Sequence, residues 1–165
     1  MITIIPNWHP IFVHFTVALF STSVGLFLLS YILNFIKKVP NSFITECNIV
    51  ARWCLWLSAL VTIITVSFGF YAYYTVKHDE ISHIAITIHR NWAIATAISI
   101  YILAGWSIFS YIKRKKITSL FLIFLIIGEG LLLSTAWRGG EVVYRYGIGV
   151  MSLPNAKEVA HHHHE

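Results

Sequence analysis

The sequence predicts an all-α membrane protein, a four-transmembrane-helix up-down bundle with both termini on the outer, periplasmic side. The first reason is composition: of 165 residues, 57% are hydrophobic and 12% are charged, and the mean hydropathy is +0.71. Soluble domains have a smaller apolar share, about 45 to 50%. The second reason is the presence of four long apolar stretches. The third is that the basic residues flank these stretches, so a lipid bilayer is the expected environment.

Each apolar stretch is close to the roughly 20 residues that a helix needs to cross hydrocarbon. The predicted spans are Pro10 to Ile36, Ala51 to Val76, about Ile86 to Ile112, and Thr118 to Trp137. Short loops between them favour an up-down bundle, in which each helix satisfies its own backbone groups. A single domain, residues 1–153, holds all four spans. Residues 154–165 form a polar tail whose four histidines, 161–164, are either a native metal-binding run or part of an expression tag.

The loops between the spans differ in charge. Lys37, Lys38 and Arg52 lie between the first two spans, and four consecutive basic residues, 113–116, lie between the last two. The positive-inside rule places both of these basic regions in the cytoplasm. We therefore expect a multi-pass protein of the bacterial inner membrane with both termini in the periplasm.

Several function classes have no support in the sequence. The net charge of +5 comes from basic residues beside apolar runs, so no nucleic-acid partner is expected. The two cysteines, Cys47 and Cys54, do not form the C-x-x-C-H motif of covalent haem attachment. No internal repeat, phosphate-binding glycine loop, nucleophile elbow or paired-carboxylate arrangement is found. We expect an electron-transfer or metal-binding protein instead of a conventional enzyme.

The histidines outside the tail gather at one predicted membrane face. Measured from the basic inner edge, His14 lies 23 residues from Lys37 and His89 lies 24 residues from Lys113, so their depths differ by about 1.5 Å. The first and third spans run in the same direction. His14 and His89 are therefore expected to face each other across the bundle, as in a bis-histidine b-type haem site. The other histidines of this face, slightly further out or in the adjoining loop, are His9, His78 and His83.

Other interpretations of these histidines stay open. A set of His9, His14, His83 and His89 is suited to copper, zinc or iron at the outer face, because imidazoles are common ligands of these ions. Interfacial histidines also act simply as anchors that hydrogen-bond headgroups or helix ends. Three arginines surround the layer, either as partners of haem propionates or as plain interfacial anchors; they are Arg90, Arg138 and Arg145.

Two carboxylates also stand out. Glu129 lies between Gly128 and Gly130 near the predicted bilayer midplane, where an ionised carboxylate is costly. It is either a proton relay or a hydrogen-bond partner of a hydroxyl on a neighbouring helix, and the glycines would allow close helix approach. Glu141, after the last span, either orients a histidine or pairs with a neighbouring arginine.

Three stretches carry recognisable motifs: His-Pro-x-x-x-His within Asn7 to Phe15, a histidine-rich run from His78 to Ala93, and Gly-Gly-Glu-x-x-Tyr-x-x-Gly within Trp137 to Val150. With these motifs, nearly the whole chain resembles the DUF2231 family of small bacterial membrane proteins. The resemblance implies a four-helix membrane domain whose relatives are often joined to, or found alongside, cytochrome-type redox proteins, without an established activity. Some relatives carry histidine where Trp137 or Tyr146 stands here, so the resemblance favours ligands from the first and third helices.

The leading prediction is a membrane b-type cytochrome-like protein. It holds one haem b near the outer face, ligated by His14 and His89, and exchanges electrons with a periplasmic redox protein or a quinone. All five histidines outside the tail fall on the outer side, so a second haem layer is not expected. One alternative is a membrane protein with an outward-facing copper, zinc or iron site. Another is a non-catalytic subunit of a membrane redox complex.

Overall fold

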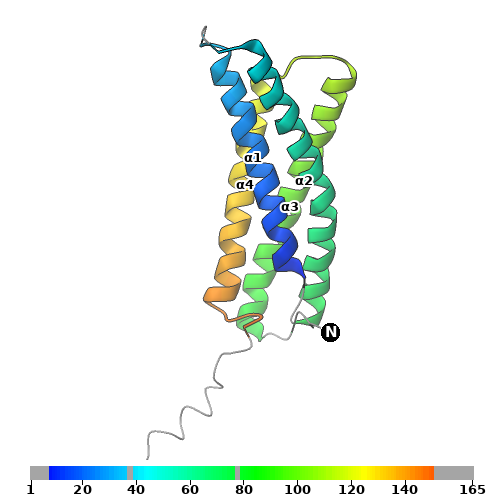
Figure 1. The fold of residues 1–165 in the computed structure, drawn as a ribbon. Coiled ribbons are helices and arrows are strands. Elements are labelled where there is room, and N and C mark those ends of the chain that lie inside the picture. Colours follow the sequence, from blue (N-terminus) through cyan, green and yellow to red (C-terminus); the bar gives the residue numbers. More distant parts are fainter. Residues whose placement is uncertain (1–7, 37–38, 77–78, 151–165) are drawn as a thin grey trace, which may run out of the picture.

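Four long α-helices make up the part of the chain that the computed structural model describes, residues 8–36, 39–76 and 79–150. They are α1 (His9–Leu33), α2 (Asn41–Thr75), α3 (Glu80–Ile112) and α4 (Ser119–Tyr144), each long and apolar enough to cross a membrane. The helices alternate in direction, so α1 begins and α4 ends at one end of the bundle (Figure 1). The predicted all-α, four-span fold is confirmed, whereas the membrane side of the termini stays a prediction. His78 and the terminal histidines lie outside the described residues.

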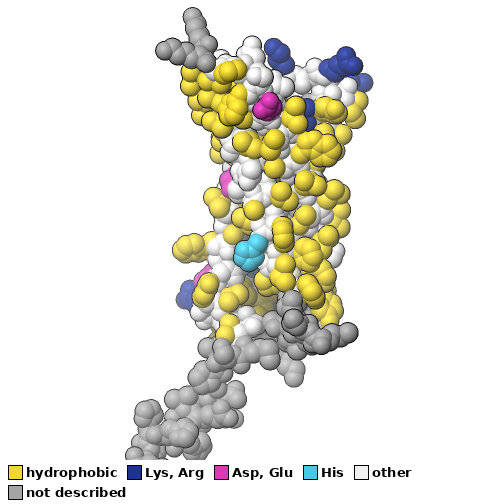
Figure 2. Space-filling model, in the orientation of Figure 1, with side chains coloured by type: hydrophobic (Ala, Val, Ile, Leu, Met, Phe, Trp, Pro, Cys, Tyr) yellow, Lys and Arg dark blue, Asp and Glu magenta, His cyan; other side chains and the backbone are white. Residues whose placement is uncertain are grey.

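We call the end where α1 and α3 begin the histidine end, and the opposite end, where Lys113, Lys115 and Lys116 follow α3, the lysine end. Hydrophobic side chains cover the visible flank of the bundle between these ends, and lysine and arginine side chains lie near the ends (Figure 2). This distribution is typical of a helix bundle whose flanks contact lipid and whose ends contact water.

Local sequence signals explain where the helices begin and end. α1 carries Pro10 in its first turn, where the missing backbone N–H is not needed. Its last residue is Leu33, three residues before the predicted end of the span, and the Asn34 side chain that follows donates to the Ser30 carbonyl at 2.7 Å. α3 begins at a capping box in which Asp79 accepts from the backbone N–H of Ser82 at 2.8 Å. α2 begins ten residues earlier, and α4 ends seven residues later, than predicted.

The helices form two hairpins, α1–α2 and α3–α4, that pack side by side. Contacts within each hairpin are more extensive than contacts between hairpins, and α1 contacts α4 only sparingly. α1 and α3 therefore occupy one diagonal of the bundle, and α2 and α4 the other. Each helix contributes a fully buried side chain to one hydrophobic cluster in the interior: Phe20, Leu55, Ile100 and Leu125.

The two hairpins repeat one another. Each buried residue of α1 matches a buried residue of α3 that lies 80 positions later: Thr16 and Thr96, Phe20 and Ile100, Ser23 and Leu103, Val24 and Ala104, Phe27 and Ser107, Ser30 and Ser110. Four buried residues of α2 match buried residues of α4 that lie 70 positions later: Ala51 and Phe121, Leu55 and Leu125, Ser58 and Gly128, Thr62 and Leu132. Because α1 and α3 run in the same direction, the hairpins are related by an approximate two-fold axis along the bundle.

This repeat corrects the sequence prediction, which finds none. Matched buried positions mostly hold different residue types, as at Phe20 and Ile100 or at Phe27 and Ser107. The two halves preserve which positions are buried instead of which side chains fill them. A comparison of residue identities therefore does not reveal the relationship.

A polar contact joins α1 and α4, the neighbouring helices that pack least closely. The Ser21 hydroxyl of α1 donates to Oε1 of Glu129 on α4 at 2.7 Å. Glu129 therefore has the hydrogen bond to a neighbouring hydroxyl that is one of its two predicted roles. Its role as a proton relay stays a prediction.

Two glycines of α4 offer a test of the packing. A Cβ at Gly128 would lie 3.0 Å from the Ser99 hydroxyl and 3.1 Å from Leu103 and Phe20, whereas a Cβ at Gly130 would have nothing within 4 Å. We expect Gly128→Ala to lower the free energy of unfolding by about 1–3 kcal/mol through overpacking. Gly130→Ala should leave it unchanged or raise it slightly. Unfolding of both variants in the same detergent checks this, and equal effects would contradict the packing described here.

Candidate functional site: a histidine pair

His9 and His89 meet near the approximate two-fold axis at the histidine end. Their ring centroids lie 6.4 Å apart, and the ring planes are inclined at 73°. His9 is the first residue of α1, and His89 lies nine residues inside α3, about 13 Å along that helix. The pair is therefore recessed between the longer helices. The two histidines also correspond to one another in the repeat, 80 positions apart.

Each imidazole is held by the next helix of its own hairpin. His9 Nδ1 donates to the backbone carbonyl of Thr65 on α2 at 2.9 Å, and His89 Nδ1 donates to the carbonyl of Thr135 on α4 at 3.2 Å. A carbonyl oxygen only accepts hydrogen bonds, so both rings carry their proton on Nδ1 when neutral. Nε2 then carries the lone pair of each ring, which is the arrangement of a histidine oriented for metal ligation.

Each imidazole also lies against a glycine. A Cβ added to Gly69 of α2 would lie 3.0 Å from Cε1 of His9, and one added to Gly139 of α4 would lie 3.1 Å from Cε1 of His89. These glycines, and the two threonines that accept from the rings, are site residues that the sequence analysis misses. The signal that would have found them is a Thr-x-x-x-Gly pattern that occurs once in each hairpin, at Thr65 and at Thr135.

Buried hydroxyls lie directly beneath the pair. Thr16 and Thr65 are joined by their hydroxyls at 2.8 Å, and Thr96 and Thr135 are joined in the same way at 2.8 Å. Each bond links the two helices of one hairpin. Thr65 and Thr135 thus have two roles: their backbone carbonyls accept from the rings, and their hydroxyls join the two helices of each hairpin.

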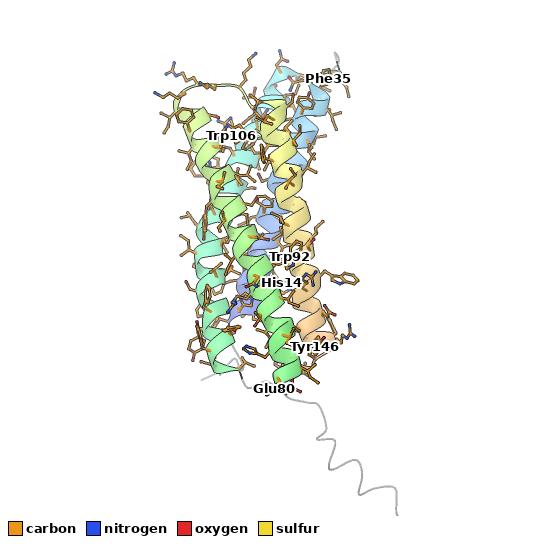
Figure 3. The ribbon with its side chains drawn as sticks, turned by 180° about the vertical axis from the view of Figure 1, so that it is seen from behind. His14, Phe35, Glu80, Trp92, Trp106 and Tyr146 are labelled. Atoms are coloured by element: carbon orange, nitrogen blue, oxygen red, sulfur yellow. The ribbon has the colours of Figure 1, made fainter. Side chains whose placement is uncertain are left out.

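The sequence predicts that His14 faces His89, but the structure brings His9 there. His14 is exposed, and its Nδ1 is hydrogen-bonded to the carbonyl of Pro10 on its own helix. In Figure 3 it lies at about the level of Trp92. His14 is therefore not part of the pair that the fold assembles.

The sequence prediction measures the depth of each histidine from the first lysine after its helix, and this reference causes the difference. α1 ends four residues before the first lysine that follows it, whereas α3 ends directly before a lysine. Lysines are thus not equally distant from the two helix ends. Measured from the last helical residues, Leu33 and Ile112, His9 lies 24 residues away and His89 lies 23 residues away. The equal depth predicted for a histidine pair is present, but with His9.

Two of the predicted site residues, His83 and Arg90, lie on the α2–α3 side of the bundle, where both contact the ring of Tyr73. The His83 ring lies 5.8 Å from the Tyr73 ring, and the Arg90 guanidinium lies 4.7 Å from the centre of the same ring. Tyr73 also contacts the Thr87 hydroxyl at 3.3 Å. His83 and Arg90 therefore belong to the surface between α2 and α3 instead of to the histidine pair.

The predicted arginines of α4 have different partners. Arg138 lies over the indole of Trp92 on α3, 5.1 Å from its centre. Arg145 forms an ion pair with Glu141 at 3.0 Å, which is one of the two predicted roles of that carboxylate. Together with Arg90, these arginines rest on three different partners, so they do not converge on one anion-binding point.

Within the described ranges, no group of three or more histidine, cysteine or acidic side chains is close enough to hold a metal ion. The four-histidine metal site predicted from His9, His14, His83 and His89 is thus not assembled by this part of the chain. Of that set, His9 and His89 have rings in edge-to-face contact, with centroids 6.4 Å apart.

A bundle of four membrane-spanning helices with a recessed histidine pair at one end defines a small integral membrane protein. The family model described as predicted membrane protein (DUF2231) matches residues 6–152. The chain belongs to this family. No curated protein and no solved structure matched the chain.

The glycines beneath the rings give a prediction. Gly69→Ala and Gly139→Ala should each displace one imidazole, because the added Cβ would lie 3.0 or 3.1 Å from its Cε1. Histidine side-chain NMR signals should shift in both variants, with helix content unchanged. Gly25→Ala is the matched control, since a Cβ there meets nothing within 4 Å. Unchanged histidine signals in both site variants would contradict the placement of the rings.

Proposed function

We propose that this protein binds one haem b through His9 and His89 and carries electrons at the histidine end of the bundle. The observation that carries the proposal is the separation of the two ring centroids, 6.4 Å. Imidazole nitrogens bind a transition metal at about 2 Å, so two imidazoles on opposite sides of one ion have ring centres roughly 6 Å apart. The pair thus has the spacing of axial ligands.

The helices of the other diagonal support the same interpretation. A haem would be held by His9 and His89 on one diagonal of the bundle, with α2 and α4 as its neighbours on the other. Those helices carry Gly69 and Gly139 at this level, and each glycine admits the imidazole of its own hairpin, which lies 3.0 or 3.1 Å from the position a Cβ would take. The described residues bring together two imidazoles and no third ligating side chain, which suits a haem, whose porphyrin supplies the remaining nitrogen ligands, better than an ion that needs four protein ligands.

The residues of the chain orient the two imidazoles and place them at one end of the bundle. The Thr65 and Thr135 carbonyls fix the rotation of the two rings, which strengthens an imidazole as a ligand. When bound, the haem supplies a one-electron couple. The buried Phe20 and Ile100 side chains separate this end from the lysine end. Electrons therefore enter and leave on the same side, from a redox protein in the adjoining aqueous compartment or from a quinone.

The ligand assignment has a direct test. Protein purified with added haem should show a Soret band that sharpens on reduction, and His9→Ala and His89→Ala should each lose the low-spin form because one axial ligand is gone. His14→Ala is the matched control and should keep the wild-type spectrum. If His14→Ala loses the band and His9→Ala keeps it, the pairing is wrong. If wild-type protein with native helix content binds no haem, the function is wrong.

A bare copper, zinc or iron ion is the second candidate, since imidazole is a common ligand of all three. Elemental analysis of purified protein distinguishes it from haem. One copper per chain without porphyrin, lost in both His9→Ala and His89→Ala, would support the ion. Iron that is extracted together with porphyrin would support haem.

A further inference from the structure

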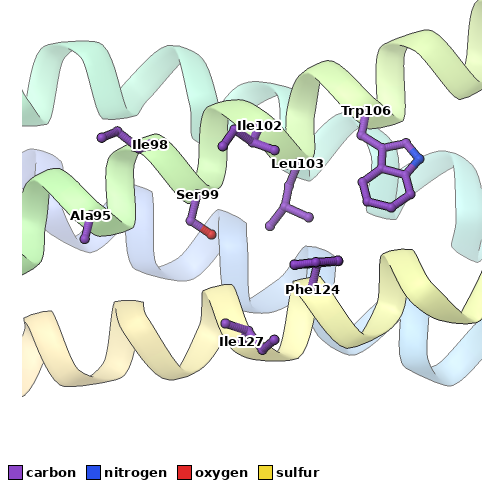
Figure 4. Close-up of a pocket in the computed structure, with 8 residues that line it drawn as sticks. All are labelled: Ala95, Ile98, Ser99, Ile102, Leu103, Trp106, Phe124 and Ile127. Atoms are coloured by element: carbon purple, nitrogen blue, oxygen red, sulfur yellow. The ribbon is translucent and has the colours of Figure 1, made fainter.

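An open groove runs along the exposed side of the α3–α4 hairpin, away from the histidine pair (Figure 4). Its volume is about 270 Å³. The small residues Ala95 and Ser99 of α3 line one half, Trp106 lies at the other end, and Phe124 and Ile127 of α4 form the facing wall. Ala95 and Trp106 are eleven residues apart, so the groove extends for about 16 Å along the helix.

An arginine, Arg138, lies beyond the groove toward the histidine end, on the same side of the α3–α4 hairpin. Trp92 lies one helical turn before Ala95 on the same side of α3, and the Arg138 guanidinium of α4 rests on its indole at 5.1 Å. Trp92 is 21 residues from Lys113, about 31 Å, and the hydrocarbon core is roughly 30 Å thick. With the lysine end at one boundary of the hydrocarbon, Trp92 and Arg138 lie at the other, at the level of lipid phosphates.

The first hairpin provides an internal comparison for the groove. With the shift of 80 positions, Ala95 and Ser99 of α3 correspond to Phe15 and Leu19 of α1. At these two positions the first hairpin therefore has larger side chains than the second, whereas at Ile98, Ile102 and Phe124 it has the smaller Ala18, Thr22 and Cys54. The side chains that line the opening between α3 and α4 thus differ from those of the first hairpin.

The cation is a second departure at the same place. Trp92 and Arg138 correspond to Phe12 of α1 and Phe68 of α2, whose rings stack with centroids 5.4 Å apart. The second hairpin thus has a charged group at the membrane boundary and an open apolar groove below it. The first hairpin has two aromatic rings and no cation at these positions.

We propose that this groove, with the Trp92–Arg138 pair at its outer end, binds one anionic phospholipid. The phosphate accepts charge-assisted hydrogen bonds from the Arg138 guanidinium, which the Trp92 indole holds in place. One acyl chain fills the groove from Ala95 toward Trp106. This site is independent of haem binding at His9 and His89.

The positive charge of Arg138 at the outer end of the groove favours an anionic lipid over a transmembrane helix or a neutral quinone. A transmembrane helix packed on Ala95 and Ser99 would enclose Arg138 beneath an apolar surface without an anion, which is costly at the membrane boundary. A neutral isoprenoid quinone would leave the guanidinium charge uncompensated. An anionic lipid satisfies both the cation and the apolar groove.

Native mass spectrometry of protein equilibrated with phosphatidylglycerol and phosphatidylethanolamine in equal amounts tests the proposal. Wild-type protein should retain one phosphatidylglycerol per chain in preference to phosphatidylethanolamine. Arg138→Gln should reduce this retention roughly fivefold, the effect of one arginine near a membrane surface. The double variant Ala95→Phe/Ser99→Leu, which installs the residues of α1, should reduce it by obstructing the chain. Arg145→Gln is the control, since Arg145 is already paired with Glu141.

Circular dichroism and the melting temperature confirm that each variant is folded before its lipid content is compared. Retention at the wild-type level in both Arg138→Gln and the groove-filled variant would overturn the proposal, as would equal retention of the two lipids by wild-type protein. A retained quinone, or a dimer that the groove-filled variant abolishes, would assign the groove to a different occupant and would also overturn it.

Discussion

The hydrogen bond from each imidazole to a threonine carbonyl on the next helix is the contact on which the rest of the site depends. Within a helix, the carbonyl of Thr65 points toward the residue four positions later, which is Gly69, and Thr135 and Gly139 have the same spacing. A side chain at either glycine would push the ring away, because its Cβ would lie 3.0 or 3.1 Å from the imidazole. Glycine therefore lets a helix carbonyl accept from a neighbouring helix, and this hydrogen bond orients both rings.

The approximate two-fold relation between the hairpins explains why there is a single site. His9 and His89 occupy equivalent positions near the axis, so two copies of one half-site combine into one pair instead of forming two separate centres. Away from the axis, the halves have diverged. The stacked rings of Phe12 and Phe68 in one hairpin correspond to a tryptophan and an arginine in the other. The paired histidines are the same in both halves, whereas the matched positions of the buried core and of the lipid-facing surface mostly hold different residues.

Much of the fold follows from hydropathy and charge, since only helices with apolar flanks satisfy their backbone groups in lipid. The depth of the histidine layer was also predictable, because the helix rise is constant. The choice between His9 and His14 was not, because it depends on α1 ending at Leu33, four residues before the first of the lysines that served as a reference. The repeat was not predictable either, because matched buried positions hold different residue types, as at Phe27 and Ser107. Gly69 and Gly139 acquire meaning only when a ring from another helix is placed against them.

Electron paramagnetic resonance of the oxidised, haem-loaded His14→Ala protein tests the central claim most directly, because the spin state of ferric haem reports how many strong axial ligands it has. With His9 and His89 as the ligands, this variant should show a low-spin signal of two imidazoles identical to that of the wild-type protein. A high-spin signal in this variant, with a low-spin signal retained in His9→Ala, would contradict the assignment of the pair.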